Sequence, residues 1–191
     1  MAIAIKKTIP TSEGGDVLSS SLSTAEGAQL TAEKPKPSIT VRLPLLSEVL
    51  TKVHGAKTKA QKIKILKEED CQALRQICQW SFNPKIESQL PSGTPPYIEN
   101  DAPEGTEHTL LRTEGDSLWH YVKTNNKSAD PNLQSTVRER MFIRLLEGLH
   151  KDEAELLCAV KEKSLHQVYK GLSTQVVSEA FGWNEEFQEY K

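Results

Sequence analysis

The chain has 191 residues, of which 37% are hydrophobic and 26% are charged, and its formal net charge is −2. This balance gives no overall attraction to nucleic acid or to an anionic membrane, and no stretch approaches the ~20 consecutive apolar residues of a membrane-spanning helix. The three cysteines, Cys71, Cys78 and Cys158, are a sparse and odd set, typical of free thiols in a reducing cytosol. We therefore expect one globular domain with an appendage and no membrane partner.

Residues 1–44 are predicted to form an extended or disordered arm. They are rich in Ser, Thr, Gly and Ala and contain no aromatic residue, so they bury too little apolar surface to offset the entropy of ordering. Within the arm, Ile39, Val41 and Leu43 alternate with polar neighbours, which predicts a short strand at 38–43. The arm either stays unstructured or becomes ordered by adding this strand to a neighbouring molecule.

Residues 45–191 are predicted to form a helical domain. A first helix begins after Pro44 and ends at Gly55, and Thr58 caps a second helix that runs to Glu69. Asp70 is the expected cap of a third helix, which ends before Asn83 and Pro84.

A loop and further helices are predicted in the second half of the chain. A long irregular loop, rich in proline, covers about 84–112, and helical patterning returns at 117–122 and at 133–149. Asp152 is predicted to cap the next helix, and Ser173 the last one, which ends at Gly182. The predicted fold is all-α: a compact bundle of six or seven short helices with this loop and the N-terminal arm.

Several motifs carry a family resemblance. In chain order they are LPLLSEVLTKV, APEGTEHT, LWHYVK, MFIRLLEGLHKDEAELL and VYKGLSTQVVSEAFGWN, and they span about residues 43–183. In these motifs the chain resembles a small family of unknown function found in T-even-like tailed bacteriophages, especially those that infect cyanobacteria. The resemblance implies a phage gene and no mechanism, and the arm before Leu43 lies outside it.

One acidic loop invites a metal-binding interpretation. PPYIENDAPEGTEHT, residues 95–109, holds Glu99, Asp101, Glu104, Glu107 and His108. Calcium takes six to eight oxygen ligands, but the spacing here lacks the D-x-[DN]-x-[DN]-G order of the known calcium loop. Pro103 and Gly105 instead favour a tight turn whose acidic side chains are hydrated. We expect no bound metal and no cofactor.

No motif for nucleophilic or nucleotide chemistry is present. The sequence contains no G-x-S-x-G, no G-x-x-x-x-G-K-[ST] and no G-x-G-x-x-G, and its five histidines lie in separate segments. We therefore predict a noncatalytic protein, while an enzyme whose site forms only on folding stays an alternative.

A basic segment provides a second alternative. Six lysines and no acidic residue lie in Leu50–Lys67: Lys52, Lys57, Lys59, Lys62, Lys64 and Lys67. Such a cluster can neutralise phosphates and give salt-sensitive, nonspecific nucleic-acid binding. No aromatic residue lies between the lysines to stack on bases, and acidic residues follow directly. A solvated helix face explains the segment equally well.

The C-terminal segment carries an aromatic stripe. Trp183, Phe187 and Tyr190 are spaced i, i+4 and i+7, beside several glutamates. On a terminal helix the three rings either pack on the protein's own core or form an exposed docking site, since aromatic residues dominate interface hot spots.

Together these features predict a protein that acts by binding other phage or host proteins. It is expected either in the host cytoplasm during infection, as an accessory factor, or in the virion. In the virion the arm, with Ile39, Val41 and Leu43, would contact neighbouring subunits.

Overall fold

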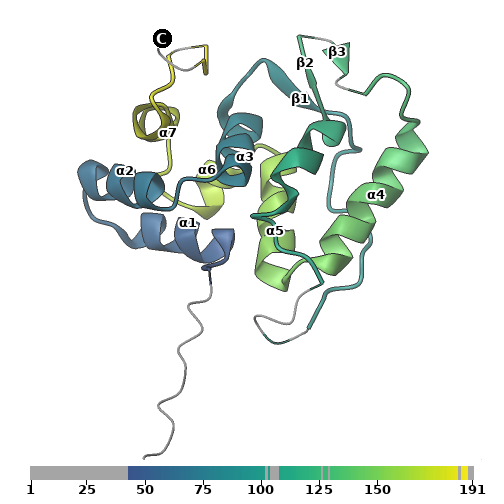
Figure 1. The fold of residues 1–191 in the computed structure, drawn as a ribbon, viewed down its shortest axis with the longest axis horizontal. Coiled ribbons are helices and arrows are strands. Elements are labelled where there is room, and N and C mark those ends of the chain that lie inside the picture. Colours follow the sequence, from purple (N-terminus) through teal and green to yellow (C-terminus); the bar gives the residue numbers. More distant parts are fainter. Residues whose placement is uncertain are drawn as a thin grey trace, which may run out of the picture. The chain divides into compact units, whose positions relative to one another are not determined.

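The computed structural model of the chain describes residues 43–101, 103, 108–125, 127–128, 130–184 and 186–188. Figure 1 shows the elements that they form. In chain order these are α1 (Leu46–Gly55), α2 (Lys59–Glu68), α3 (Gln72–Phe82), β1 (Ile86–Ser88), the 3-10 helix η1 (Glu114–Tyr121), β2 (Val122–Thr124), β3 (Lys127–Ser128), α4 (Ser135–Gly148), α5 (Lys151–Lys161), α6 (Leu165–Val168) and α7 (Thr174–Phe181). The described part is mostly helical, as predicted, but it is not all-α because three strands are also present.

The ends of the first helices follow from local sequence. α1 ends at Gly55, and Thr58 Oγ1 accepts a hydrogen bond of 3.2 Å from the backbone N–H of Gln61 at the start of α2. The predicted cap of α3 is wrong, because Cys71 is its N-cap. The Asp70 carboxylate instead accepts two hydrogen bonds from the Arg75 guanidinium, at 2.8 and 2.7 Å, a pairing stronger than a neutral cap.

A small antiparallel sheet was not predicted. β1 pairs with β2, with Ile86 opposite Thr124, and β2 pairs with β3, with Lys123 opposite Ser128. The predicted loop at 84–112 therefore contains a strand, and the predicted helix at 117–122 ends in one. Each strand has three residues or fewer, which is too short to show a period-2 pattern in the sequence.

The helix expected at 117–122 is the 3-10 helix η1, which packs closely on α3. Gly115 of η1 lies against Ala73 of α3, where an added Cβ atom would be 3.0 Å from the Ala73 backbone nitrogen. The absence of a side chain at Gly115 thus lets the two helices approach this closely.

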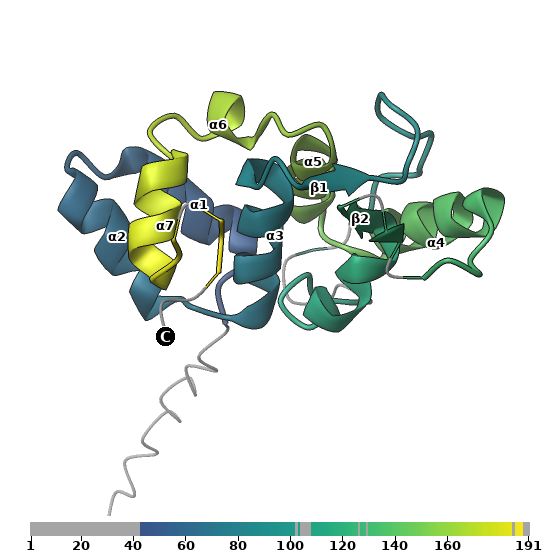
Figure 2. The same ribbon diagram turned by 90° about the horizontal axis from the view of Figure 1, so that it is seen from above.

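Helix α5 packs against α1, α3, α4 and α6. Its apolar residues Leu156, Leu157 and Val160 are buried in the core. Figures 1 and 2 show α4 beside α5, on the side away from α1 and α2, and α7 beside α2. The start of α5 differs from the prediction: His150, and not Asp152, is the N-cap, with His150 Nδ1 accepting a hydrogen bond from the Asp152 backbone N–H.

A buried arginine joins α4 to η1. The Arg138 guanidinium donates hydrogen bonds to the backbone carbonyls of His120 (2.8 Å), Asp130 (3.2 Å) and Leu133 (3.1 Å). Its five N–H groups suit this task, since they satisfy several carbonyl groups at once.

In the described part of the chain, every helix is too short or too polar to cross a membrane.

Candidate functional site

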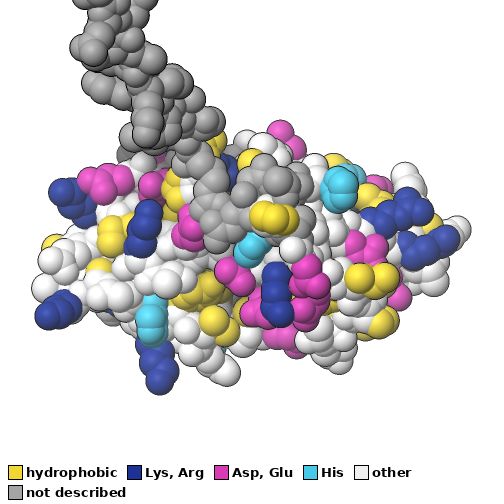
Figure 3. Space-filling view, turned by 90° about the horizontal axis from the view of Figure 1, so that it is seen from below, with side chains coloured by type: hydrophobic (Ala, Val, Ile, Leu, Met, Phe, Trp, Pro, Cys, Tyr) yellow, Lys and Arg dark blue, Asp and Glu magenta, His cyan; other side chains and the backbone are white. Residues whose placement is uncertain are grey.

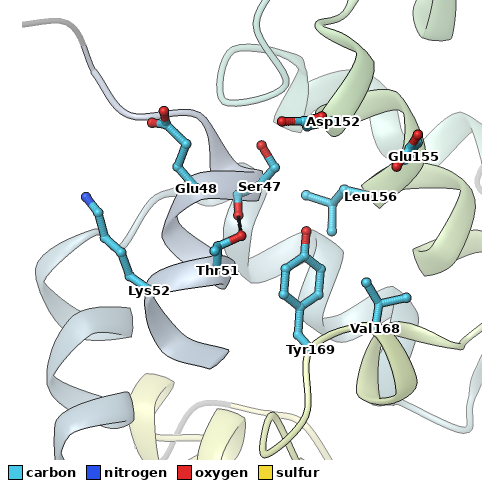
Figure 4. A pocket seen from close by; sticks show the side chains of 9 residues that line it. All are labelled: Ser47, Glu48, Thr51, Lys52, Asp152, Glu155, Leu156, Val168 and Tyr169. Atoms are coloured by element: carbon cyan, nitrogen blue, oxygen red, sulfur yellow. Dashed lines mark hydrogen bonds between the residues drawn. The ribbon is translucent and has the colours of Figure 1, made fainter. Parts of the chain in front are cut away.

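A hollow of about 750 Å³ lies between α1, α5 and the chain around the end of α6 (Figure 4). We call it the α1–α5 hollow. It is lined by Ser47, Glu48, Thr51, Lys52, Asp152, Glu155, Leu156, Val168 and Tyr169. These residues come from three segments that lie far apart in the sequence, and the hollow is large enough for a ligand or for side chains of a partner.

Charge in the hollow is predominantly negative. Glu48, Asp152 and Glu155 contribute three carboxylates, against the single ammonium group of Lys52. In Figure 4 the two α5 carboxylates lie on one side of Tyr169, and the Lys52 side chain extends away from it on the other side. A cation that enters the hollow therefore meets more negative than positive charge.

The Ser47 hydroxyl lies at the α1 side of the hollow. Ser47 is only 4% exposed, and its Oγ atom has no hydrogen-bond partner among the described residues. Thr51, one turn later, donates from Oγ1 to the Ser47 backbone carbonyl at 2.8 Å. A buried polar atom without a partner costs free energy, so the Ser47 hydroxyl marks a place where a polar ligand group would be stabilised.

Tyr169 forms the wall of the hollow opposite α5. Burial is the main cause that raises the pKa of the Tyr169 hydroxyl, and the negative charges of Asp152 and Glu155 raise it further, while a hydrogen bond with Thr51 lowers it. The hydroxyl thus stays protonated and can both donate and accept hydrogen bonds.

The apolar part of the lining is formed by Leu156 and Val168. Leu156 is buried, whereas Val168 is 54% exposed, one of the few large apolar side chains at the described surface. An exposed apolar side chain beside carboxylates and hydroxyls gives the hollow both an apolar and a polar contact surface.

Buried Glu153 holds the two walls of the hollow together. Its Oε1 atom accepts a hydrogen bond of 2.9 Å from the Leu46 backbone N–H at the start of α1, and its Oε2 atom accepts one of 2.9 Å from the Leu111 backbone N–H. The carboxylate thereby fixes α1 against α5, and with them the residues that face the hollow.

Two smaller hollows have other linings. One of about 290 Å³ lies beneath the chain from Leu90 to Pro96, where the buried Lys161 ammonium donates to the Pro91 carbonyl at 2.7 Å. The other, of about 190 Å³, lies beside the sheet between Trp80 and the 40% exposed Trp119. Both are smaller than typical ligand pockets. A third hollow, of about 530 Å³, is lined by Lys59, Gln175, Ser178, Glu179, Gly182 and Trp183. It is smaller than the α1–α5 hollow, and its two charged side chains, Lys59 and Glu179, pair with each other, so the α1–α5 hollow is the candidate site.

Two of the three aromatic residues of the stripe, Trp183 and Phe187, pack in the protein's own core and are not exposed as a docking site requires. Trp183 and Phe187 are 3% and 6% exposed, and the Trp183 ring packs on Phe187 and on Phe181 of α7. The expected helix does not continue through them, because Gly182 adopts φ +67° and ends α7. Tyr190 lies outside the described residues.

Only some of the six lysines are available to bind phosphates, since one is buried and two others pair with glutamates. Lys62 is buried and donates to the Lys170 carbonyl at 3.3 Å, Lys59 pairs with Glu179, and Lys64 lies 3.7 Å from Glu68. Lys52 lines the α1–α5 hollow, and Lys57 and Lys67 are exposed. On the face in Figure 3, the Lys and Arg side chains on the left lie apart from one another. This arrangement weakens the nucleic-acid alternative, for which Lys62 in particular is not available.

The predicted arm and acidic loop are described only in part. Ile39 and Val41 lie outside the described residues, and Leu43 is exposed and not in a strand. Glu104 and Glu107 are also outside them, while Glu99 pairs with Lys151 at 2.8 Å. No group of three or more His, Cys, Asp or Glu side chains within the described ranges is arranged to hold a metal ion.

All three cysteines are free, as predicted. Burial raises the pKa of Cys158 to about 11, and burial also raises the pKa of Cys78 well above its ordinary value. Both thiols therefore stay protonated near neutral pH, which makes them poor nucleophiles.

Comparison with known families shows which residues of the hollow lie in a family's matched range. A model of a family of unknown function (DUF6433) matches residues 49–167, more than half of the chain. No curated protein and no solved structure matches the chain. Thr51, Lys52, Asp152, Glu155 and Leu156 of the hollow lie inside the matched range, while Ser47, Glu48, Val168 and Tyr169 lie just outside it.

Proposed function

The chain belongs to this family of unknown function, DUF6433, and we propose that it is a noncatalytic protein-binding protein encoded by a tailed bacteriophage. The observation that carries the proposal is the α1–α5 hollow, in which exposed Val168 lies beside the carboxylates of Asp152 and Glu155. Interfaces combine apolar contact with a polar rim in this way. The partner is another phage protein or a host protein.

The pKa shifts of Cys158 and Tyr169 do not favour a nucleophilic role for either side chain. A thiol nucleophile or a tyrosine base needs a lowered pKa, whereas the pKa values of Cys158 and Tyr169 are raised, chiefly by burial. At neutral pH the Tyr169 hydroxyl thus serves as a neutral hydrogen-bonding group at a binding surface.

The protein acts either as an accessory factor in the host cytoplasm or as a component of the virion. The composition of residues 1–44, which favours order only within an assembly, supports the virion role. Mass spectrometry of gradient-purified particles and of infected-cell lysate, with copies counted against a major capsid protein, separates the two. Stoichiometric copies in particles indicate the virion role, and abundance in the lysate alone indicates the accessory role.

A site-specific cross-link tests the binding surface itself. We would replace Val168 by the photoreactive residue p-benzoylphenylalanine, irradiate infected cells, and identify cross-linked proteins by mass spectrometry. Ile98 is the control position, because it is 79% exposed and does not line the hollow. The proposal expects one defined partner from position 168 and none of it from position 98. Equal cross-linking from both positions, or none from position 168, contradicts it.

A further inference from the structure

We infer that the α1–α5 hollow binds a lysine side chain of the partner protein. The inference rests on the proposed function for its partner. The charge, the buried hydroxyl and the apolar surface of the hollow together indicate that the recognised group is an alkyl ammonium.

The charge of the lining favours a cationic ligand. The lining holds three carboxylates and one ammonium group. In Figure 4 the Asp152 and Glu155 side chains lie on the α5 side of Tyr169, while the Glu48 and Lys52 side chains extend away from Tyr169 on the other side. The Nδ1 atom of His150 lies 3.9 Å from Asp152 Oδ2, beyond hydrogen-bond distance. Glu155 interacts with the ammonium group of Lys151, which also pairs with Glu99, so Asp152 is the α5 carboxylate whose charge a bound ammonium would balance.

Ser47 gives an independent reason to expect a polar ligand. Its side chain is almost fully buried at the edge of the hollow, and its hydroxyl oxygen has no partner in the described part of the chain. A serine hydroxyl turns by rotation about a single bond, so Ser47 Oγ can accept a hydrogen bond from an ammonium group that enters. Binding would then satisfy an oxygen that folding alone leaves without a partner.

The positions of the acceptors favour lysine over arginine. Carboxylates project from α5, while the hydroxyls of Ser47 and Tyr169 come from other segments (Figure 4). A compact ammonium group has three donors that point in different directions and suits acceptors on separate walls. A planar guanidinium is better matched to a single carboxylate that it binds with two parallel hydrogen bonds.

The apolar lining suits the stem of a lysine. Leu156 and exposed Val168 lie beside the ring of Tyr169 (Figure 4). Lysine covers apolar surface with its four-carbon stem while its ammonium group reaches a polar region. A small inorganic cation would make no use of this surface.

A peptide titration tests the inference on the full-length protein. The probes are a capped Gly-Lys-Gly peptide, the matched peptide with norleucine in place of lysine, and one with arginine. Binding is followed by shifts of the backbone amide signals of Thr51, Leu156 and Tyr169 in ¹H–¹⁵N NMR spectra. We expect the lysine peptide to shift these signals with a dissociation constant in about the millimolar range, and the norleucine peptide to leave them unchanged.

Three variants locate the site. The double variant Asp152→Asn/Glu155→Gln should weaken binding of the lysine peptide about tenfold, since two partly exposed charge pairs are lost. Ser47→Ala should weaken binding about threefold to tenfold. The matched control Glu68→Gln/Glu179→Gln removes two carboxylates outside the hollow, both of which lie in exposed pairs, and should leave the affinity unchanged. Thermal unfolding of each variant shows that it is folded.

Several outcomes overturn the inference. Equal shifts with the norleucine peptide would show that the ammonium group is not recognised, and tighter binding of the arginine peptide would refute lysine as the ligand. Equal weakening by the control variant would indicate general charge attraction. Shifts at these amides when the protein alone is diluted would show that a second copy occupies the hollow.

The two proposals fail in different ways. A partner cross-linked from position 168, combined with no response to the lysine peptide, leaves the binding function intact and refutes the lysine ligand. A lysine-dependent shift without any cross-linked partner supports recognition of a lysine by the hollow and contradicts the binding of a partner protein at this surface.

Discussion

The Oε1 atom of Glu153 lies 2.9 Å from the backbone nitrogen of Leu46, which is 107 residues earlier in the chain. This contact satisfies one of the backbone N–H groups that the first turn of α1 leaves without an intrahelical partner, and it places a carboxylate at the positive end of that helix. Since the second oxygen of Glu153 accepts from Leu111, one buried side chain joins three separate segments.

Replacing Glu153 by Gln should therefore lower the free energy of unfolding by about 2–3 kcal/mol, because an amide NH₂ would face a backbone N–H where an oxygen now accepts. Urea unfolding measures the change. Glu155→Gln, at an exposed position of the same helix, is the matched control and should stay within about 0.5 kcal/mol of the unchanged protein. An equal effect of the two substitutions would mean that the Glu153 contacts contribute no stability.

Substitution by alanine should have opposite effects on stability at two glycines, Gly115 and Gly55. Gly115→Ala places a Cβ atom 3.0 Å from the Ala73 backbone and should destabilise the protein by about 1–3 kcal/mol, since η1 must move away from α3. Gly55→Ala, in the last turn of α1, meets no atom within 4 Å and should be neutral or stabilising by up to about 1 kcal/mol. Thermal unfolding of both variants checks the difference, and a harmless Gly115→Ala would show that the two helices are not tightly packed.

The stability of the protein should fall between pH 10 and 12. Burial, and to a smaller extent the charge of Glu114, raises the pKa of Tyr121 from 10.0 to about 12. A raised pKa in the folded state means that the unfolded chain loses its proton first, so the free energy of unfolding decreases as pH rises through this window. Below pH 10 both states are protonated and the full stability is present.

Tyr121→Phe isolates this contribution. The phenyl ring keeps the packing against Trp80 and Phe142 but has no proton to lose. We expect the variant to lose less stability than the unchanged protein when chemical unfolding is compared at pH 9.5 and 11.5. Cys158, whose pKa is raised to about 11, titrates in both proteins and does not affect the comparison. Identical pH profiles would contradict the raised pKa of Tyr121.

Lys161 and Glu162 should control the mobility of the proline-rich segment. The Lys161 ammonium donates to the Pro91 carbonyl at 2.7 Å, and Glu162 Oε1 accepts from the Gly93 backbone N–H at 2.9 Å. Lys161→Met keeps an apolar stem but removes the donor, so hydrogen exchange in residues 89–101 should become about tenfold faster. Lys170→Met, at an exposed position, is the control. Unchanged exchange in 89–101 would show that other contacts hold the segment.

Local features of the sequence were enough to predict the helices but not all of their ends. Thr58, Ser173 and Gly182 lie where expected, because a cap depends on residues within one turn. Asp70 is not the predicted cap, since Arg75 competes for its carboxylate. The aromatic spacing of Trp183 and Phe187 fits a helix, but the left-handed conformations of Gly182 and Phe187, at φ +67° and +58°, exclude one.

The candidate site could not be predicted from the sequence. Asp152 was expected only as a helix cap, and nothing in the sequence marks Ser47 or Tyr169, which are ordinary residues of a helix and a turn. Ser47 and Tyr169 line one hollow only because α1 packs against α5 and the chain after α6 lies beside them. Such contacts between distant segments leave no periodic pattern in the sequence.

The pairing of α2 with α7 has a consequence for protein synthesis. The ribosome releases the chain from its N-terminal end, so α1, α2 and α3 emerge well before α5 and α7, their packing partners. Until then α1 and α2 can pack on each other, but the buried faces of the three helices, with Leu50, Leu66 and Leu74, lack α5 and α7, and short helices alone are only marginally stable. We expect the core to close only after translation passes Phe181, which makes nascent and truncated chains of this protein clients for chaperones.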